Sequence, residues 1–306
     1  MPCAKPPAPG DDVEPPTLSV VAPVYNEARI LPEFVARCTQ AAEQCGRPFE
    51  VVLVDDASTD GTPGLLTSLS RDGRIRTLRL ASNAGQFRAT QAGLREARGR
   101  WIAVLDADLQ DPPETIPRLV HVLAAADPAV GAVLAVKSHR DDPLLFMLGQ
   151  FIFHRLQHAL SRVAVPRGAG AYCLMRRAIA ERVARAECRR ANLAAVVAVA
   201  VSAVGGRVET VAYEKAARYD RQGHVGWAGL IAEALDSLTI TGALPRLLAF
   251  AATGFGIAAL ATSGHRIARA LLMGAAGAAA IVSLGTSRQA RHRLAGVRAA
   301  GCAEGR

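Results

Sequence analysis

Aromatic residues are scarce in this sequence, at 5% of 306 residues, and no stretch interleaves them with basic side chains. Proteins that bind single-stranded nucleic acid combine a basic groove with aromatic rings on which the bases stack. The formal net charge of +9 therefore points to phosphate-bearing substrates or to an anionic membrane surface, and nucleic acid is the least favoured partner.

Paired cysteine motifs are also missing. Six cysteines are scattered along the chain: Cys3, Cys38, Cys45, Cys173, Cys188 and Cys302. With no C-x-x-C pair and no histidine at ligand spacing, they argue against a zinc site or a disulfide framework and indicate reduced cytosolic thiols. Residues 1–16 are rich in proline and acid and lack the apolar segment of a signal peptide, so we expect a disordered leader there.

The usual glycine-rich phosphate loops are absent as well. No G-x-G-x-x-G follows a predicted strand, and no G-x-x-x-x-G-K is present. This disfavours a dinucleotide-dependent enzyme and a P-loop ATPase. A nucleotide bound by this chain would need another way to hold its phosphates, and a metal ion is the chemical alternative.

What is present is an alternation of two apolar patterns between residues 18 and 136. Strands are expected at 18–23, 49–54, 75–80, 101–105 and 129–136, and helices at 30–44, 59–70, 86–97 and 114–125. Thr59 or Asp60 is the expected cap of the second helix. The alternation predicts an α/β fold with a mostly parallel sheet, and the mixed apolar and basic strand at 75–80 is expected at its edge.

Polar residues follow three of these strands, at 25–27, 55–56 and 106–108. Ligands of such sheets bind beyond the carboxyl ends of the strands. In an extended chain, side chains two residues apart point the same way, so Asp106, Asp108 and Gln110 would converge. Two carboxylates and an amide oxygen suit Mg²⁺ or Mn²⁺, which complete their shells with water and substrate phosphates. A pair of aspartates that only cap a loop is the alternative.

Four motifs resemble those of family 2 glycosyltransferases, and more narrowly those of the dolichyl- and undecaprenyl-phosphate sugar synthases. In family order they are SVVAPVYNE at 19–27, VDDASTDGT at 54–62, NAGQ at 83–86 and DADLQDPPE at 106–114. The resemblance covers residues 17–136. It implies a GT-A fold, a Rossmann-like sheet flanked by helices, as a domain over 17–242, and a nucleotide-sugar donor.

The resemblance also assigns roles to residues. Pro23, Tyr25 and Glu27 would line the nucleoside pocket, and Asp56 would lie at the base or ribose. Asp106 would lie near the ribose and the metal, while Asp108 and Gln110 would hold Mg²⁺ or Mn²⁺; Asp106 and Asp108 are the expected catalytic carboxylates. For Pro23 and Tyr25 a simple strand-to-helix turn is the alternative, and Asp60 with Gly61 is interpreted as a turn without a site role.

The second half of the chain matches the family more loosely. Lys137, Arg140 and Arg218 occupy positions where the family has basic residues suited to a diphosphate or a lipid phosphate; solvated surface charge is the alternative for Lys137 and Arg140. A helix expected at 144–160 carries an apolar stripe that would lean on a membrane or pack in the core.

Two departures from the family concern the acceptor. The acidic positions of a family segment align with Gly168 and Ala171, and the lysine of a later loop aligns with His224. A sugar hydroxyl must lose a proton as it attacks, so it needs a positioned base. A phosphate monoester is already mostly ionised at pH 7, with a second pKa of about 6, so the loss harms a phosphate-acceptor enzyme less.

The C-terminal region, 243–306, contains two uncharged runs at 247–264 and 270–287, followed by a basic tail. As helices each would reach about 27 Å, against roughly 30 Å of hydrocarbon. The lengths are compatible with two membrane spans, and the resemblance implies a transmembrane hairpin, because relatives commonly end in two membrane helices; a soluble helical hairpin is the alternative.

Together with the metal-binding strand end, the resemblance implies a metal-dependent inverting glycosyltransferase that moves a sugar from a nucleoside diphosphate to a polyprenyl phosphate at the cytoplasmic membrane face. Two alternatives stay open. One is transfer to a hydroxyl acceptor, with Asp111 or Glu114 as the replacement base. The other is a non-catalytic nucleotide-sugar-binding protein. The oligomeric state is left open, a homo-oligomer included.

Overall fold

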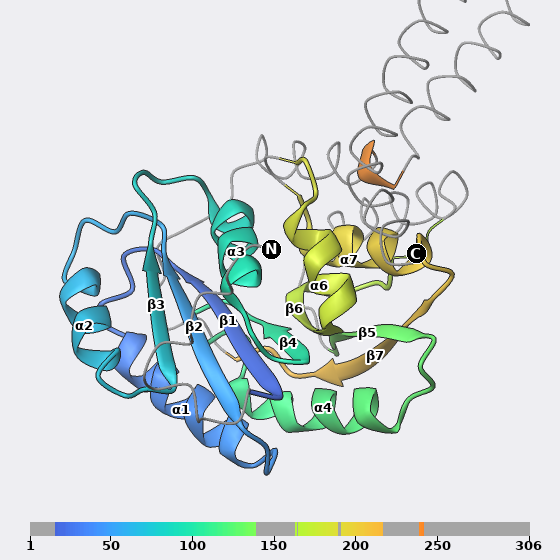
Figure 1. The fold of residues 1–306 in the computed structure, drawn as a ribbon, viewed down its shortest axis with the longest axis horizontal. Helices are drawn as coiled ribbons and strands as arrows, with labels where there is room; N and C mark the ends of the chain where they lie inside the picture. The colour runs from blue at the N-terminus through green and yellow to red at the C-terminus, as the bar shows by residue number, and fades with distance from the viewer. Residues whose placement is uncertain (1–15, 139–162, 164, 189–190, 217–238, 242–306) are drawn as a thin grey trace, which may run out of the picture.

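The computed structural model describes residues 16–138, 163, 165–188, 191–216 and 239–241 (Figure 1). The strands are β1 Leu18–Val24, β2 Phe49–Asp55, β3 Ile75–Arg79, β4 Trp101–Val104, β5 Val130–Lys137, β6 Ala169–Arg176 and β7 Arg207–Tyr213. The helices are α1 Leu31–Glu43, α2 Thr62–Leu69, α3 Gln86–Glu96, the 3₁₀ turn η1 Pro113–Thr115, α4 Ile116–Ala125, α6 Arg177–Ala184 and α7 Leu193–Ser202.

The described strands form one sheet in the order β3-β2-β1-β4-β6-β5-β7. The first four pair in parallel, β6 runs antiparallel to both of its neighbours, and β7 pairs in parallel with β5. The predicted α/β fold with a mostly parallel sheet is confirmed, and β3 lies at the edge as expected. Parallel strands of this kind bring their carboxyl ends to one side of the sheet.

Helices cover both faces of the sheet, with α1, α2 and α4 on one face and α3, α6 and α7 on the other (Figure 1). Side chains of β1 alternate between the two resulting cores. Val20 and Ala22 belong to the core beneath α1, α2 and α4, and Val21 belongs to the core beneath α3, α6 and α7. Because β1 is buried on both faces, its sequence is a nearly continuous apolar run.

Two boundary predictions are wrong. Neither Thr59 nor Asp60 caps α2, which begins at Thr62 after Gly61. Asp60 instead accepts the Thr62 N–H at 2.9 Å, as a turn residue does. The extended geometry expected through residues 106–110 also ends early, because β4 stops at Val104 and the chain then turns, with Leu109 at a φ of 58°.

The strands and helices after β5 were not among the predicted elements. Helix α7 is apolar over nine consecutive buried residues, so it has no polar face to mark a helical period. Its start is set by Asn192, whose side chain accepts the Ala195 N–H. Helix α7 therefore carries little of the periodicity on which sequence reading depends.

Within the described part of the chain, no helix combines the length and the apolar character needed to cross a bilayer. Several expectations lie outside the described residues: the two uncharged runs in 243–306, the helix at 144–160, residues 1–15 of the leader, Arg140, Arg218 and His224.

Candidate active site

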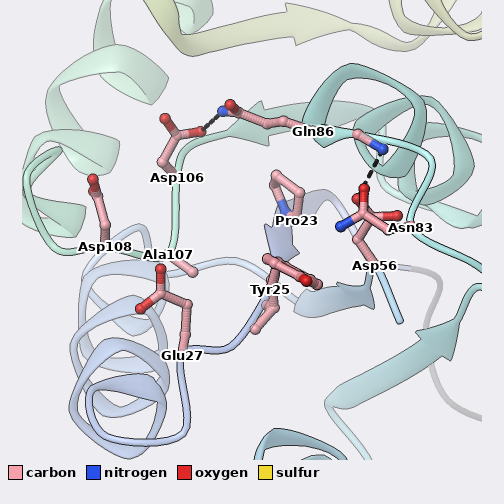
Figure 2. Close-up of a pocket in the computed structure, with 11 residues that line it drawn as sticks. Pro23, Tyr25, Glu27, Asp56, Asn83, Gln86, Asp106, Ala107 and Asp108 are labelled. Carbon is pink, nitrogen blue, oxygen red and sulfur yellow. Dashed lines mark hydrogen bonds between the residues drawn. The ribbon is translucent and has the colours of Figure 1, made fainter. Parts of the chain in front are cut away.

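A pocket opens beside the carboxyl ends of β1, β2 and β4 (Figure 2). Its walls come from four separate stretches of sequence, listed here in order: Pro23, Val24, Tyr25, Glu27, Asp56, Asn83, Gly85, Gln86, Asp106, Ala107 and Asp108. Six residues expected at a site from the sequence therefore lie around one cavity: Pro23, Tyr25, Glu27, Asp56, Asp106 and Asp108.

The segments after β1 and β2 are fastened to each other. The Asn26 N–H donates to Ser58 Oγ at 2.9 Å, and the Asn26 side-chain oxygen accepts the Thr59 N–H at 2.8 Å. The Glu27 N–H donates to Thr62 Oγ1 at 3.1 Å. These contacts hold Tyr25, whose side chain is 46% exposed, as one wall of the pocket.

Backbone strain collects around the same pocket. Among the described residues, three non-glycine residues have a positive φ: Asn26, Ala57 and Leu109. They follow β1, β2 and β4 respectively. Such conformations cost of order 1–3 kcal/mol each and tend to cluster at functional sites.

Asp56 fixes the loop that precedes α3. Its carboxylate is 3% exposed and accepts the Ala84 N–H at 2.7 Å and the Gly85 N–H at 2.9 Å. Gly85 has a φ of 88°, a conformation that favours glycine, and α3 starts immediately after it. The loop brings Asn83 and Gln86 into the pocket (Figure 2).

Asp106 and Asp108 face the pocket from the turn after β4 (Figure 2). Gln86 Nε2 donates to Asp106 Oδ1, and Asp108 Oδ1 accepts the Gln110 N–H at 3.0 Å. Burial raises the pKa of Asp106 to about 7, and the negative charges of Asp111 and Asp108 add to the rise. The carboxylates form an electronegative corner that favours a bound cation.

Gln110 does not line this pocket. It is 7% exposed, and its backbone oxygen accepts the Ala216 N–H at 3.0 Å. The chain turns through Leu109, so the alternation of an extended strand does not carry Gln110 to the side of Asp106 and Asp108.

Two tyrosines from β6 and β7 support the turn after β4. The Tyr213 hydroxyl donates to Asp111 Oδ1, and the Tyr172 hydroxyl donates to the Pro112 carbonyl at 3.0 Å. Their rings meet edge to face with centroids 5.5 Å apart. Burial raises the pKa of Asp111, and the Tyr213 hydrogen bond opposes that rise.

Lys137 ends β5 near this acidic corner. Its positive charge lowers the pKa of both Asp106 and Asp111 and so partly offsets the effect of burial. Arg140 and Arg218, grouped with it by sequence, lie outside the described residues.

The two proposed replacement bases have different surroundings. Asp111 is 6% exposed and bound by Tyr213. Glu114 pairs with Arg37 of α1, with Nε 2.7 Å from Oε1, and does not line the pocket.

Gly168 and Ala171, the two positions at which the family has acidic residues, lie in different surroundings. Gly168 has a φ of 79°, in the region that favours glycine, and Ala171 packs against the apolar core beside α6 and α7.

The donor set fits a hard divalent cation. Two carboxylates in one open pocket are the ligands that Mg²⁺ and Mn²⁺ take from protein when substrate phosphates supply the rest. No cluster of three or more histidine, cysteine or acidic residues suited to a metal occurs among the residues that the structure describes. Oxygen atoms of a substrate or of water would complete the shell of a cation held by the two carboxylates.

Sequence reasoning gave no role to Asn83, Gln86 or Tyr213. Asn83 and Gln86 stand in a motif that had been identified, so their presence near the site was signalled, although their contacts were not. Tyr213 lies 102 residues from Asp111 along the chain, and no sequence pattern links the two.

Comparison with known proteins adds a partial curated relative. The undecaprenyl-phosphate 4-deoxy-4-formamido-L-arabinose transferase of Salmonella paratyphi B is 44% identical over 129 residues, which is 42% of this chain and 38% of that protein. The matched segment thus spans well under half the length of the curated relatives.

Solved structures share the fold at low identity. A mannosyltransferase from Pyrobaculum calidifontis, solved with GDP-Man and Mn²⁺, has a TM-score of 0.51 at 24% identity, covering 96% of this chain and 91% of that one. Glucosyl-3-phosphoglycerate synthase from Mycobacterium tuberculosis, solved with Mn²⁺, UDP and phosphoglyceric acid, has a TM-score of 0.52 at 18% identity, covering 73% and 76%. The fold is GT-A-like.

The profile described as "Glycosyl transferase family 2" matches residues 19–184, which is more than half of the chain. That stretch runs from β1 into α6 and includes every residue of the pocket. The chain belongs to glycosyl transferase family 2.

Proposed function

We propose that the chain transfers a sugar from a nucleoside-diphosphate donor to a polyprenyl phosphate at the cytoplasmic face of a membrane. The observation that carries the proposal is the single pocket that Asp106 and Asp108 line together with Tyr25, Glu27 and Asp56. Carboxylates for a cation and an exposed aromatic ring in one cleft suit a ligand with both a diphosphate and a base.

The donor's nucleoside would lie against Pro23 and Tyr25. A half-exposed ring offers a stacking surface to a base, and such stacking is worth about 1–3 kcal/mol. Glu27 and Asp56 also line the pocket, on either side of Tyr25 (Figure 2), and would accept hydrogen bonds from ribose or base. These contacts position the donor so that its sugar projects toward the acceptor side.

Asp106 and Asp108 would hold Mg²⁺ or Mn²⁺ against the diphosphate. When bound, the cation supplies Lewis-acid stabilisation of the negative charge that develops on the departing nucleoside diphosphate. Gln86 keeps Asp106 oriented, and the Gln110 N–H does the same for Asp108. In the structural neighbours, a mannosyltransferase was solved with GDP-Man and Mn²⁺ and a synthase with Mg²⁺ and UDP.

The acceptor would attack the anomeric carbon from the face opposite the leaving group. One phosphate oxygen forms the new C–O bond as the bond from the anomeric carbon to the diphosphate breaks, so the configuration inverts. Lys137 would neutralise the acceptor phosphate, together with Arg140 and Arg218. An ionised phosphate needs positioning and charge neutralisation more than a base, which agrees with Gly168 and Ala171 at positions where the family has acidic residues.

The acceptor class comes from the partial relative, an undecaprenyl-phosphate transferase. A hydroxyl acceptor is less well supported. Asp111, its candidate base, is nearly buried and already accepts the Tyr213 hydrogen bond, and Glu114 is paired with Arg37. A polyprenyl phosphate resides in the bilayer, so we also propose a catalytic domain over 17–242 and a membrane hairpin within 243–306.

The test is a transfer assay on membranes that contain the full chain. Membranes are incubated with a panel of radiolabelled nucleotide sugars, and the lipid fraction is extracted and counted. Label in a lipid whose sugar is released by mild acid supports the proposal.

Parallel incubations with soluble hydroxyl acceptors test the alternative that the sugar is transferred to a hydroxyl group. Label only in those acceptors overturns the lipid-phosphate assignment. Nucleotide binding with no transfer to any acceptor overturns the enzymatic assignment in favour of a binding protein.

A further inference from the structure

The amide of Gln86 is the side-chain group that meets Asp106 directly. It is the first residue of α3, and its Nε2 donates to Asp106 Oδ1 across the pocket (Figure 2). Its backbone oxygen accepts the Thr90 hydroxyl at 2.9 Å. Among the described residues no hydrogen bond reaches Asp106 Oδ2, so the contact restrains one oxygen and leaves the other for a ligand.

Helix α3 is itself immobilised by packing. Phe87, the next residue, is buried, and Gly93 lies so close to Val21 and Val54 that a Cβ there would overlap their side chains. The helix therefore cannot shift without disturbing β1 and β2. Only its first turn carries a polar side chain into the pocket.

The direction of that first turn is fixed by Asp56. Both of its carboxylate oxygens are occupied by the Ala84 and Gly85 N–H groups, immediately before Gln86. Gly85 has no Cβ and therefore adopts a φ of 88° without a steric penalty. A contiguous series of contacts thus runs from Asp56 through the 84–85 backbone and Gln86 to Asp106.

We propose that Gln86 is a positioning residue for the cation site, orienting Asp106, and that Asp56 acts on the same carboxylate through Gln86. This inference rests on the proposed function, because it assumes that a cation binds at Asp106 and Asp108. It gives Asp56 a second role beside the nucleoside, one that persists when no nucleotide is present. It also predicts that the two ends of the pocket are energetically coupled.

The test measures binding of Mn²⁺ alone to the purified full chain, by titration calorimetry or by the electron paramagnetic resonance signal of free Mn²⁺. Gln86→Met keeps the side-chain length and removes the N–H donor. A hydrogen bond to a charged group is typically lost at a cost that corresponds to about a tenfold weaker Kd. Asp56→Asn retains one acceptor oxygen and should weaken Mn²⁺ binding by about threefold to tenfold on the same basis.

The double variant decides whether Asp56 acts through Gln86. If it does, Gln86→Met combined with Asp56→Asn binds Mn²⁺ no more weakly than Gln86→Met alone, because the two effects share one pathway. Losses that multiply would overturn the proposed route through Gln86.

Gln91→Met is the matched control, since it makes the same change on the same helix. Gln91 Nε2 donates to the carbonyls of Val183 and Ala186, at 3.0 and 2.7 Å, on the side away from the pocket. This variant should lower the melting temperature and leave the Mn²⁺ Kd unchanged. Equal loss of Mn²⁺ affinity in Gln91→Met and Gln86→Met would mean a general effect of destabilising α3, and would overturn the proposal.

Asp108→Asn separates this inference from the proposed function. If Asp108→Asn weakens Mn²⁺ binding and Gln86→Met does not, the positioning role is wrong and the cation site stands. If Asp108→Asn also leaves binding unchanged, the cation site itself is wrong, and the positioning role falls with it.

Discussion

The two halves of the sheet, the one that carries the pocket and the one beside it, use their polar groups differently. On the side built by β1, β2 and β4, hydrogen bonds such as those of Asn26 and Asp56 join backbone segments, while Tyr25, Asp106 and Asp108 still face the cavity. On the side built by β5, β6 and β7, the tyrosine hydroxyls are committed to the turn after β4.

The residues after β1, β2 and β4 are thus available to contact a ligand, whereas those of β6 and β7 support the turn after β4. Residues from β1 to β4 supply a preorganised set of oxygen atoms, at the expense of three strained backbone positions. Residues from β6 and β7 hold that set in place from behind. Among the described residues of the second side, Lys137 is the basic group whose charge reaches Asp106 and Asp111.

The largest expected effect comes from removing a charge on the ligand-contact side. Asp108→Asn keeps the oxygen that accepts the Gln110 N–H, so the turn should survive. Loss of a carboxylate that holds the cation should lower sugar transfer about a thousandfold, equivalent to about 4 kcal/mol of transition-state stabilisation. Initial rates of transfer to lipid measure it, with the melting temperature as a check on folding.

Asp127→Asn is the matched control for Asp108. Asp127 also accepts a backbone N–H two residues ahead, that of Ala129 at 2.7 Å, in an exposed turn before β5. It should keep the parent rate. Transfer by Asp108→Asn at the parent rate would abolish the distinction between the two halves of the sheet.

The next effect concerns the supporting side. Tyr213→Phe removes the hydroxyl that donates to the nearly buried Asp111, and should lower the free energy of unfolding by about 1.5–3 kcal/mol. Tyr172→Phe removes a bond to a neutral carbonyl and should cost about 1 kcal/mol. Chemical denaturation of the two variants compares them. A larger loss for Tyr172→Phe than for Tyr213→Phe would contradict a supporting role centred on Asp111.

A smaller effect tests the strain around the pocket. Ala57 has a φ of 60°, which costs an L residue roughly 1–2 kcal/mol and glycine almost nothing. Ala57→Gly should therefore leave the free energy of unfolding unchanged or raise it by about 0.5 kcal/mol, after the added freedom of the unfolded chain. Ala92→Gly, inside α3, should lower it by about 1 kcal/mol. Equal losses in the free energy of unfolding for Ala57→Gly and Ala92→Gly would contradict the presence of backbone strain at Ala57.

The same division explains how far the sequence alone could reach. The β1–β4 half has buried strands and helices whose apolar residues recur at helical spacing, and this alternation predicted its parallel sheet. The β6–β7 half has an apolar helix without a polar face and a strand, β6, that reverses direction. Helix α7 therefore leaves no helical period to detect. Helix α6 does have one, with Ile179, Ala180, Val183 and Ala184 buried on one face, and was missed all the same.

At the site, the sequence predicted most of the residues that line the pocket but not the hydrogen bonds between them. Asp106 and Asp108 were found because they follow a buried strand. Gln110 was grouped with them by extending strand alternation beyond Val104, where the turn at Leu109 breaks it. The contact of Gln86 with Asp106 depends on how α3 is set on the sheet, and no local pattern encodes that placement.

The last expected effect concerns Glu114, which the sequence suggested as a possible replacement base and which the structure pairs with Arg37. The Arg37 guanidinium lowers the pKa of Glu114 below its ordinary value. A carboxyl whose pKa is lower in the folded state stabilises the fold above its unfolded pKa of about 4.3, and that contribution disappears as the pH falls through the folded value.

Because both side chains are partly exposed, Arg37→Gln should lower the free energy of unfolding at pH 7 by about 0.2–1 kcal/mol. The difference from the parent should shrink as the pH falls below about 4, where Glu114 becomes protonated in both states. Urea denaturation at pH 7 and pH 3 measures both. Glu114→Gln should leave the rate of sugar transfer intact, because this carboxylate joins α1 to η1 and does not line the pocket. A transfer rate that collapsed in Glu114→Gln would make it a base after all, and would shift the acceptor assignment toward a hydroxyl.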